Sequence, residues 1–132
     1  MQFYIIVELN DLTYKIRGAI FTVHKVLGPG LLESVYEAAL AYELNELGLE
    51  VKTQVGLPVE YKSILLELGF RIDILVNNQI IIEIKSVETL YDVHKKQLLT
   101  YLKLSGKRIG ILVNFNSSVL VDKESLVRII NG

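Results

Sequence analysis

Two neighbouring apolar segments, residues 65–76 and 80–86, are interrupted by charged side chains. The first segment contains Asp73, and the second contains Glu83 and Lys85. Runs rich in isoleucine, leucine and valine predict strands of a buried sheet. Because a charge buried without a partner is strongly unfavourable, two acids and a lysine in such strands indicate a metal site or a catalytic site.

The register of the predicted hairpin decides how close these charges lie. A two-residue turn at 77–78 would mix apolar with charged positions on each face, whereas a three-residue loop at 77–79 makes one face wholly aliphatic. The residues of that aliphatic face are Ile72, Ile74, Val76, Ile80, Ile82 and Ile84. On the other face Asp73 would lie directly opposite Glu83, with about 5 Å between their Cβ atoms.

Two carboxylates at this distance repel each other unless a cation or a shared proton lies between them. Lys85, two residues after Glu83, would neutralise only one of them. A divalent metal ion would balance the charge. The alternative is a buried structural cluster of ion pairs, because structural networks also collect charges on strands.

The composition restricts the chemistry of such a site. The chain contains no cysteine, which excludes disulfides, zinc–thiolate sites and cysteine nucleophiles. A metal ion in this protein would therefore be bound mainly by oxygen ligands, and the two histidines are the remaining candidate ligands.

Length, charge and hydropathy set the general class. A chain of 132 residues fits one domain, residues 1–132, and its net charge of -1 provides no global attraction for nucleic acid. The hydrophobic content of 51% favours a homodimer in which a second subunit covers apolar surface. The first residues lack the basic region of a signal peptide, and no apolar run approaches the length of about 18 residues that a membrane span needs, so we expect no membrane contact and a cytoplasmic location.

Periodicity and turn residues predict the order helix, helix, strands, helix, strands. The first helix is expected to start at Asn10 or Asp11 and to end at 28–30. The further expected helices cover 31–47 and 88–104. The expected strands cover 49–55, 57–61, 65–76, 80–86 and 108–115, with minor elements at 119–121 and 126–130. This order indicates an α/β fold with a mixed sheet flanked by helices.

Two of the expected helices carry polar side chains on one face. In the third helix, Gln97 and Tyr101 are four residues apart and are therefore neighbours. They either point toward the charged hairpin or are a boundary residue and a core residue. His94 shares their face, but a single histidine is more often solvated or hydrogen-bonded than a ligand. Glu33 falls in the first turn of the second helix, where the helix dipole alone favours a carboxylate.

The order of these residues resembles the PD-(D/E)XK nuclease superfamily. The motifs in order are Glu33, Asp73, Glu83-x-Lys85 and Gln97-x-x-x-Tyr101, the last of which is similar to its RecB-like branch. More narrowly, the segment 23–36, which includes Gly30-x-x-Glu33-x-x-Tyr36, resembles the GxxExxY family within that superfamily. The resemblance implies a restriction-endonuclease-like core with the order α-α-β-β-β-α-β.

The resemblance also implies roles for individual residues. Asp73, Glu83 and the backbone carbonyl of Ile84 would hold Mg²⁺, for which Mn²⁺ would substitute, and Glu33 would bind the metal directly or through water. Lys85 would orient the attacking water and stabilise charge on the phosphate, while Gln97 and Tyr101 would support the site. Substrate-binding or structural roles are expected for Tyr36, Arg71, His94, Lys95 and Lys96. The superfamily's proline before the first acid is missing, because Arg71 and Ile72 precede Asp73.

The function implied by the resemblance is metal-dependent hydrolysis of phosphodiester bonds in nucleic acid, with DNA favoured over RNA. One alternative is a catalytically silent nucleic-acid-binding or assembly module with the same fold. Another is metal-dependent chemistry on a small phosphate ester. Since the chain has no evident sequence-reading module or large basic stripe, weak and unspecific binding or action beside a protein partner is expected.

Overall fold

The computed structural model describes the backbone of residues 2–67 and 69–132 and the side chains of residues 8–67 and 69–132. Within these residues the helices are α1 (Gln2–Leu27), α2 (Glu33–Glu46) and α3 (Asp92–Ser105). The strands are β1 (Val51–Gly56), β2 (Val59–Tyr61), β3 (Ile64–Leu66), β4 (Arg71–Val76), β5 (Ile80–Lys85), β6 (Ile109–Asn114) and β7 (Leu126–Ile130). The predicted α/β class is confirmed.

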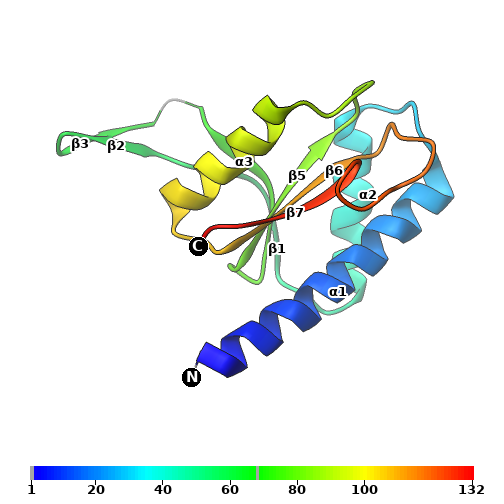
Figure 1. Cartoon of the computed structure of the whole chain (residues 1–132), viewed down its shortest axis with the longest axis horizontal. Coiled ribbons are helices and arrows are strands. Elements are labelled where there is room, and N and C mark those ends of the chain that lie inside the picture. The colour runs from blue at the N-terminus through cyan, green and yellow to red at the C-terminus, as the bar shows by residue number, and fades with distance from the viewer. Residues whose placement is uncertain (1, 68) are drawn as a thin grey trace.

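The central sheet is mixed, with the strand order β1-β4-β5-β6-β7. β5 and β6 run parallel, and the other neighbouring pairs run antiparallel. A parallel pair needs a long crossover, which α3 provides between β5 and β6. Helices α1 and α2 cover one face of the sheet and α3 covers the other (Figure 1). The sheet therefore separates two apolar cores.

The β4–β5 hairpin has the register of the predicted three-residue loop. Val76 pairs with Ile80 and Ile74 pairs with Ile82. Asn77 and Asn78 have φ values of 50° and 55°, a left-handed conformation that asparagine tolerates better than most residues. The regular ladder stops at Ile74, because from Asp73 onward side-chain carboxylates replace backbone carbonyls as acceptors for strand N–H groups.

This interruption makes the prediction of one continuous aliphatic face wrong at Ile72. Ile74 and Ile84 pack in the core beneath α1 and α2, whereas Ile72 packs in the core beneath α3. The alternation of strand faces assumes a regular ladder on both sides. Because the ladder is not regular around Asp73, the alternation fails there, and the side chain of Ile72 lies on the opposite face of the sheet.

Several predicted boundaries also shift. Asn10 and Asp11 do not cap α1, since the helix starts at Gln2 and Leu9 and Leu12 continue its buried stripe. The third helix begins at Asp92, later than expected, and no strand forms at 119–121. The strand expected over 65–76 is divided into β3 and β4, with Gly69 in a left-handed conformation between them. The predicted ends of the first helix and of β7 are confirmed.

β2 and β3 form a separate two-stranded hairpin that projects from the body of the molecule (Figure 1). It connects β1 to β4, which are adjacent in the main sheet. None of the described helices has the combination of length and apolarity that a membrane crossing requires.

Close packing of α3 on the sheet depends on Gly110 in β6. A Cβ atom at this position would lie 2.7 Å from Cδ1 of the buried Leu98 on α3. We expect Gly110→Ala to lower the free energy of unfolding by about 1–3 kcal/mol, because overpacking a dense core forces side chains from their preferred rotamers. Urea unfolding measures this change.

Gly18→Ala is the matched control, since a Cβ atom on this α1 residue would meet no atom within 4 Å. Alanine is the better helix former, so this substitution is expected to stabilise the protein by up to about 1 kcal/mol. Equal effects of the two substitutions would contradict the packing role of Gly110.

Candidate metal and catalytic site

The centre of the site is formed by Asp73 on β4 and Glu83 on β5. The backbone N–H of Asp73 donates to Oε1 of Glu83 at 3.2 Å, and the N–H of Ile84 donates to Oδ2 of Asp73 at 2.8 Å. Glu83 is buried, with 4% of its surface exposed, while Asp73 is half-buried. Each carboxylate thus accepts a hydrogen bond from the backbone of the other strand. The two acids lie close together, as predicted, although the expected direct pairing of Asp73 with Glu83 is not formed.

The burial of Glu83 changes its protonation. Burial and then the negative charge of Asp73 raise the pKa of Glu83 from 4.5 to about 8, although the N–H of Asp73 and the charge of Lys85 oppose this shift. In the absence of another cation Glu83 is therefore mostly protonated at neutral pH. A divalent cation beside both acids would favour the ionised form.

A cleft of about 280 Å³ opens on the α2 side of Asp73. Its lining residues are Glu33, Ser34, Glu37, Gln54, Asp73 and Ile84. Three of these carry carboxylates, and they come from α2 and β4. The sequence prediction placed Glu33 and Asp73 in one site, and the cleft brings them together.

Glu33 connects the start of α2 to the end of β5. Its Oε2 accepts a hydrogen bond from the N–H of Ser86 at 2.9 Å, and the Ser86 hydroxyl donates to the carbonyl of Leu31 at 2.6 Å. Ser86 directly follows Lys85. Glu33 therefore lines the cleft and also holds the backbone next to the predicted catalytic lysine.

Tyr36 has a structural position. It is fully buried, and its ring stacks on Phe115 with the centroids 4.6 Å apart. Its hydroxyl donates to the carbonyl of Gly28 at 2.5 Å and accepts from the N–H of Leu31 at 3.1 Å. The tyrosine thus closes the glycine-containing turn before α2 and holds Glu33 in place, with no surface for a substrate.

Three residues of the cleft lining, Ser34, Glu37 and Gln54, were not predicted as site residues, and the last two contact each other. Nε2 of Gln54 lies 2.6 Å from Oε1 of Glu37 and 3.4 Å from Oδ1 of Asp73. The pKa of Glu37 is raised, mainly by burial and also by the charge of Asp73, although the hydrogen bond from Gln54 opposes the shift. Glu37 follows Glu33 by one helical turn and could have been found from that spacing. Gln54 gave no such signal, because its contacts depend on an irregular backbone.

Tyr101 approaches the acids from the α3 side of the sheet. It is buried, and burial together with the charges of Glu83 and Asp73 raises its pKa. Gln97 donates to the Tyr101 hydroxyl at 3.2 Å, as their spacing predicted. Phe70 contacts the ring edge to face with 6.1 Å between centroids. Gln97 is exposed, and its hydrogen bond among the described contacts goes to Tyr101 and not to the acids.

Lys85 is half-buried at the end of β5, and its amine makes no ion pair or hydrogen bond with the residues that the structure describes. The chain after it is held by Asn114, a buried β6 residue that pairs with Lys85. Asn114 accepts from the N–H of Val87 at 3.0 Å and donates to its carbonyl at 2.8 Å. Asn114 is thus a supporting residue that the sequence did not reveal.

The remaining predicted residues lie apart from the cleft lining. Nδ1 of His94 accepts from the N–H of Tyr91 at 3.0 Å, which caps the start of α3. Lys95 and Lys96 follow it in the same helix, where Lys96 is exposed. Arg71 is exposed, and its guanidinium donates to the carbonyl of Gln54 at 3.4 Å.

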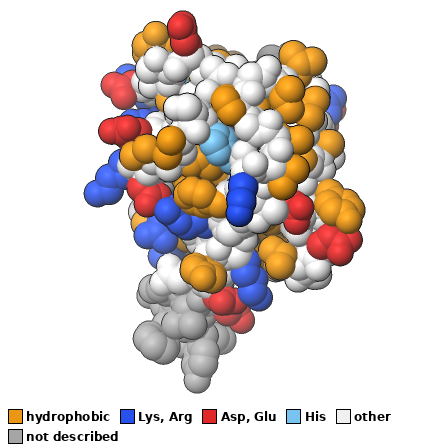
Figure 2. Space-filling view, turned by 90° about the vertical axis from the view of Figure 1, so that its right-hand side faces the viewer, with side chains coloured by type: hydrophobic (Ala, Val, Ile, Leu, Met, Phe, Trp, Pro, Cys, Tyr) orange, Lys and Arg blue, Asp and Glu red, His pale blue; other side chains and the backbone are white. Residues whose placement is uncertain are grey.

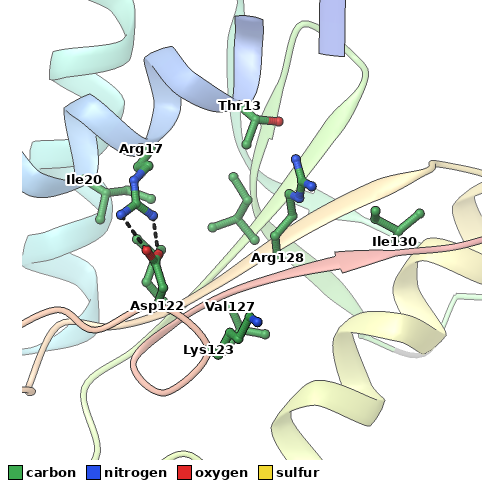
Figure 3. A pocket seen from close by; sticks show the side chains of 10 residues that line it. Thr13, Arg17, Ile20, Asp122, Lys123, Val127, Arg128 and Ile130 are labelled. Carbon is green, nitrogen blue, oxygen red and sulfur yellow. Dashed lines mark hydrogen bonds and ion pairs between the residues drawn. The ribbon is translucent and has the colours of Figure 1, made fainter. Parts of the chain in front are cut away.

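A second cavity, of about 450 Å³, lies between α1 and β7 (Figure 3). In it Arg17 of α1 forms a two-pronged ion pair with Asp122, which lowers the pKa of that carboxyl. None of the predicted site residues lines this cavity. The ion pair attaches α1 to the loop before β7.

The donor set of the main site suits a hard divalent cation. Over the described residues, no three His, Cys, Asp or Glu side chains are arranged to hold a metal ion together. Mg²⁺ does not require three, since it keeps several waters and commonly binds through one or two carboxylates. Asp73 and Glu83 provide such a pair. Burial and the negative charge of Asp73 raise the pKa of Glu83, and a bound cation would offset that negative charge.

A family model described as PD-(D/E)XK nuclease superfamily matches residues 10–129. The chain belongs to the PD-(D/E)XK nuclease superfamily. The match extends from α1 into β7 and so includes every helix and strand that contributes to the cleft. Comparisons with curated proteins and with solved structures gave no significant match. Membership in this superfamily agrees with the mixed sheet and its flanking helices.

The pKa of Glu83 predicts a pH dependence for the metal-free protein. The folded state keeps a proton up to about pH 8 that the unfolded chain releases near pH 4.5. The free energy of unfolding therefore falls as the pH rises between these values, by up to about 1.4 kcal/mol per pH unit, and levels off above them. Glu83→Gln removes this contribution because the amide does not titrate. Urea unfolding in EDTA across this range measures it.

Glu60→Gln is the control, since this exposed acid lies on the projecting β2–β3 hairpin. Its pH profile is expected to follow that of the wild type. Parallel profiles for the wild type and Glu83→Gln would contradict the buried, protonated state of Glu83.

Proposed function

We propose that this protein is a metal-dependent nuclease that hydrolyses phosphodiester bonds. The observation that carries the proposal is the buried Glu83 beside Asp73, two residues before Lys85, in a chain of the PD-(D/E)XK nuclease superfamily. A structural ion-pair cluster explains this arrangement less well. The described part of the chain contains no ion pair between Lys85 and either acid.

In this proposal Asp73, Glu83 and the backbone carbonyl of Ile84 hold Mg²⁺ or Mn²⁺, with Glu33 as a direct or water-mediated ligand. The metal ion would supply Lewis acidity to the phosphate and increase the acidity of the attacking water. Asp73 is already oriented by the N–H of Ile84, so little rearrangement is needed on binding. Preorganised ligands of this kind lose little free energy to ordering when the cation arrives.

Lys85 is proposed to stabilise the charge that develops on the phosphate oxygens and to orient the attacking water. Its amine is free of partners among the described residues, and its backbone is fixed by Ser86 on one side and by its pairing with Asn114 on the other. An ammonium without a protein partner, on a backbone held at this position, suits this role, because preorganised positive charges near a developing anion provide much of the rate acceleration in phosphoryl chemistry.

Tyr101 and Gln97 are proposed to support the site from α3. Tyr101 lies near enough to the acids for their charges to raise its pKa, and it is a neutral phenol at neutral pH. It is therefore a hydrogen-bonding group near neutral pH and not a base. Gln97 orients that phenol through the 3.2 Å contact and leaves its remaining amide positions open to solvent or phosphate. This arrangement supports assignment to the RecB-like branch.

We also assign the chain to the GxxExxY family. The hydrogen bonds of Glu33 and Tyr36 give that motif a physical meaning. Tyr36 closes the turn between α1 and α2, and Glu33 attaches that turn to the residue after Lys85. The motif thus joins the helical layer to the end of the strand that carries the proposed catalytic lysine.

The proposed substrate is nucleic acid, with DNA favoured over RNA by analogy with the superfamily. The face shown in Figure 2 carries basic, acidic and hydrophobic side chains side by side and not one broad basic surface. Because the net charge of the chain is -1 and this face carries no broad basic surface, binding is proposed to be weak and unspecific or assisted by a partner. Exposed apolar residues on α1 and α2, which include Tyr14, Val26 and Tyr42, are proposed to be covered in a homodimer.

The proposal predicts cleavage of DNA that requires Mg²⁺ or Mn²⁺ and stops in EDTA. Asp73→Ala and Lys85→Ala should each lower the rate about 100-fold or more, because each removes an interaction made to the reacting phosphate or its cation. Single- and double-stranded DNA and RNA, end-labelled and analysed on gels, provide the measurement and separate the substrate classes.

Lys15→Ala is the control for lost positive charge, since this exposed α1 lysine pairs only with Asp11 among the described residues. It should cleave at the wild-type rate. Absence of cleavage with all substrates and both metals, or cleavage that persists in Asp73→Ala and Lys85→Ala, would refute the proposal. In that case a catalytically silent binding module becomes the better description.

A further inference from the structure

Strand β1 is irregular at one residue beside the site. Thr53 pairs with Ile74 and Val55 pairs with Ile72, so the register places Gln54 opposite Asp73, but these two residues form no backbone pair. Gln54 has a φ of 52°, in the left-handed region. The strand therefore deviates where it passes the acid of the neighbouring strand.

A glutamine does not help the backbone to adopt this conformation. Left-handed φ values are unfavourable for residues with a Cβ atom, and glycine adopts them more readily. Residues held in such conformations are frequent at functional sites, where the side chain has a task that offsets the strain. We therefore expect the side chain of Gln54 to make contacts that offset this strain.

The side-chain amide of Gln54 lies between two carboxylates. Nε2 is 2.6 Å from Oε1 of Glu37 and 3.4 Å from Oδ1 of Asp73. A primary amide has two N–H bonds, so one hydrogen can point to each acid. The amide thus connects two like-charged groups without adding a charge that would compete with a metal ion.

Asp73 is held from both sides as a result. The N–H of Ile84 donates to its Oδ2 at 2.8 Å, while Gln54 approaches its Oδ1. Gln54, which is exposed, has a further contact, because Arg71 donates to its carbonyl at 3.4 Å. Each oxygen of the Asp73 carboxylate thus has a donor from a neighbouring strand, an arrangement that disfavours rotation of the group.

We infer that Gln54 is a positioning residue that orients Asp73 for divalent cation binding and links it to Glu37 of α2. This inference rests on the proposed metal site and adds to it a residue outside the superfamily motifs described above. In this role Gln54 would act through Asp73, since its side chain contacts Asp73 and Glu37. Groups that orient metal ligands in this way commonly contribute 10- to 100-fold to metal affinity.

The test compares Mn²⁺ affinity with stability in two variants. Gln54→Gly removes the amide but suits the left-handed backbone, and Gln54→Met keeps the length of the side chain without a donor. Both are expected to bind Mn²⁺ about tenfold or more weakly in isothermal titration calorimetry. The melting temperature of metal-free Gln54→Gly is expected to equal or exceed that of the wild type, which separates loss of positioning from loss of folding.

Ser63→Gly is the matched control. Ser63 also has a left-handed backbone, with a φ of 84°, but it lies in the turn of the projecting β2–β3 hairpin. This variant should bind Mn²⁺ as the wild type does. Wild-type affinity in both Gln54 variants would overturn the positioning role and leave the metal site intact. No Mn²⁺ binding by the wild type would overturn both this inference and the proposed function.

Discussion

Asp73 and Glu83 each accept a hydrogen bond from the backbone of the opposite strand, and this exchange interrupts the ladder between β4 and β5. The interruption costs regular strand pairing and buries a carboxyl group whose pKa rises to about 8. As a result, two acids lie close together, each next in sequence to a core residue: Ile72 of one core precedes Asp73, and Ile84 of the other follows Glu83. The irregularity of β1 at Gln54, the packing of Ile72 beneath α3 and the approach of Tyr101 all occur beside this pair.

Helices α2 and α3 and strand β6 each contribute contacts that support the region around Asp73 and Glu83. α2 contributes Glu33, whose bond to Ser86 fixes the end of β5, and β6 contributes Asn114, which holds the next residue of the same loop. α3 packs tightly on β6 at Gly110 and brings Tyr101 to the other side of the sheet. The superfamily fold therefore serves to support a short stretch of two strands from several directions.

Much of this arrangement could be predicted from the sequence, since it follows from periodicity. The aliphatic positions determined the three-residue hairpin loop, and helical spacing brought Gln97 to Tyr101. The rest depends on tertiary contacts. Ile72 changes face because Asp73 and Glu83 replace the backbone ladder, and Gln54 reaches the cleft only through a left-handed backbone. Asn114 is one polar residue in a buried strand, and nothing in its spacing points to the loop that it holds.

The central claim is that the acid pair is a cation site, and diffraction from crystals soaked in Mn²⁺ tests it most directly. The account predicts an anomalous peak within about 2.0–2.3 Å of carboxylate oxygens from both Asp73 and Glu83, with waters completing the coordination shell. The same map should show Lys85 free of both acids. No peak at these residues, with the amine of Lys85 instead bonded to Glu83, would contradict the account and identify a structural ion pair.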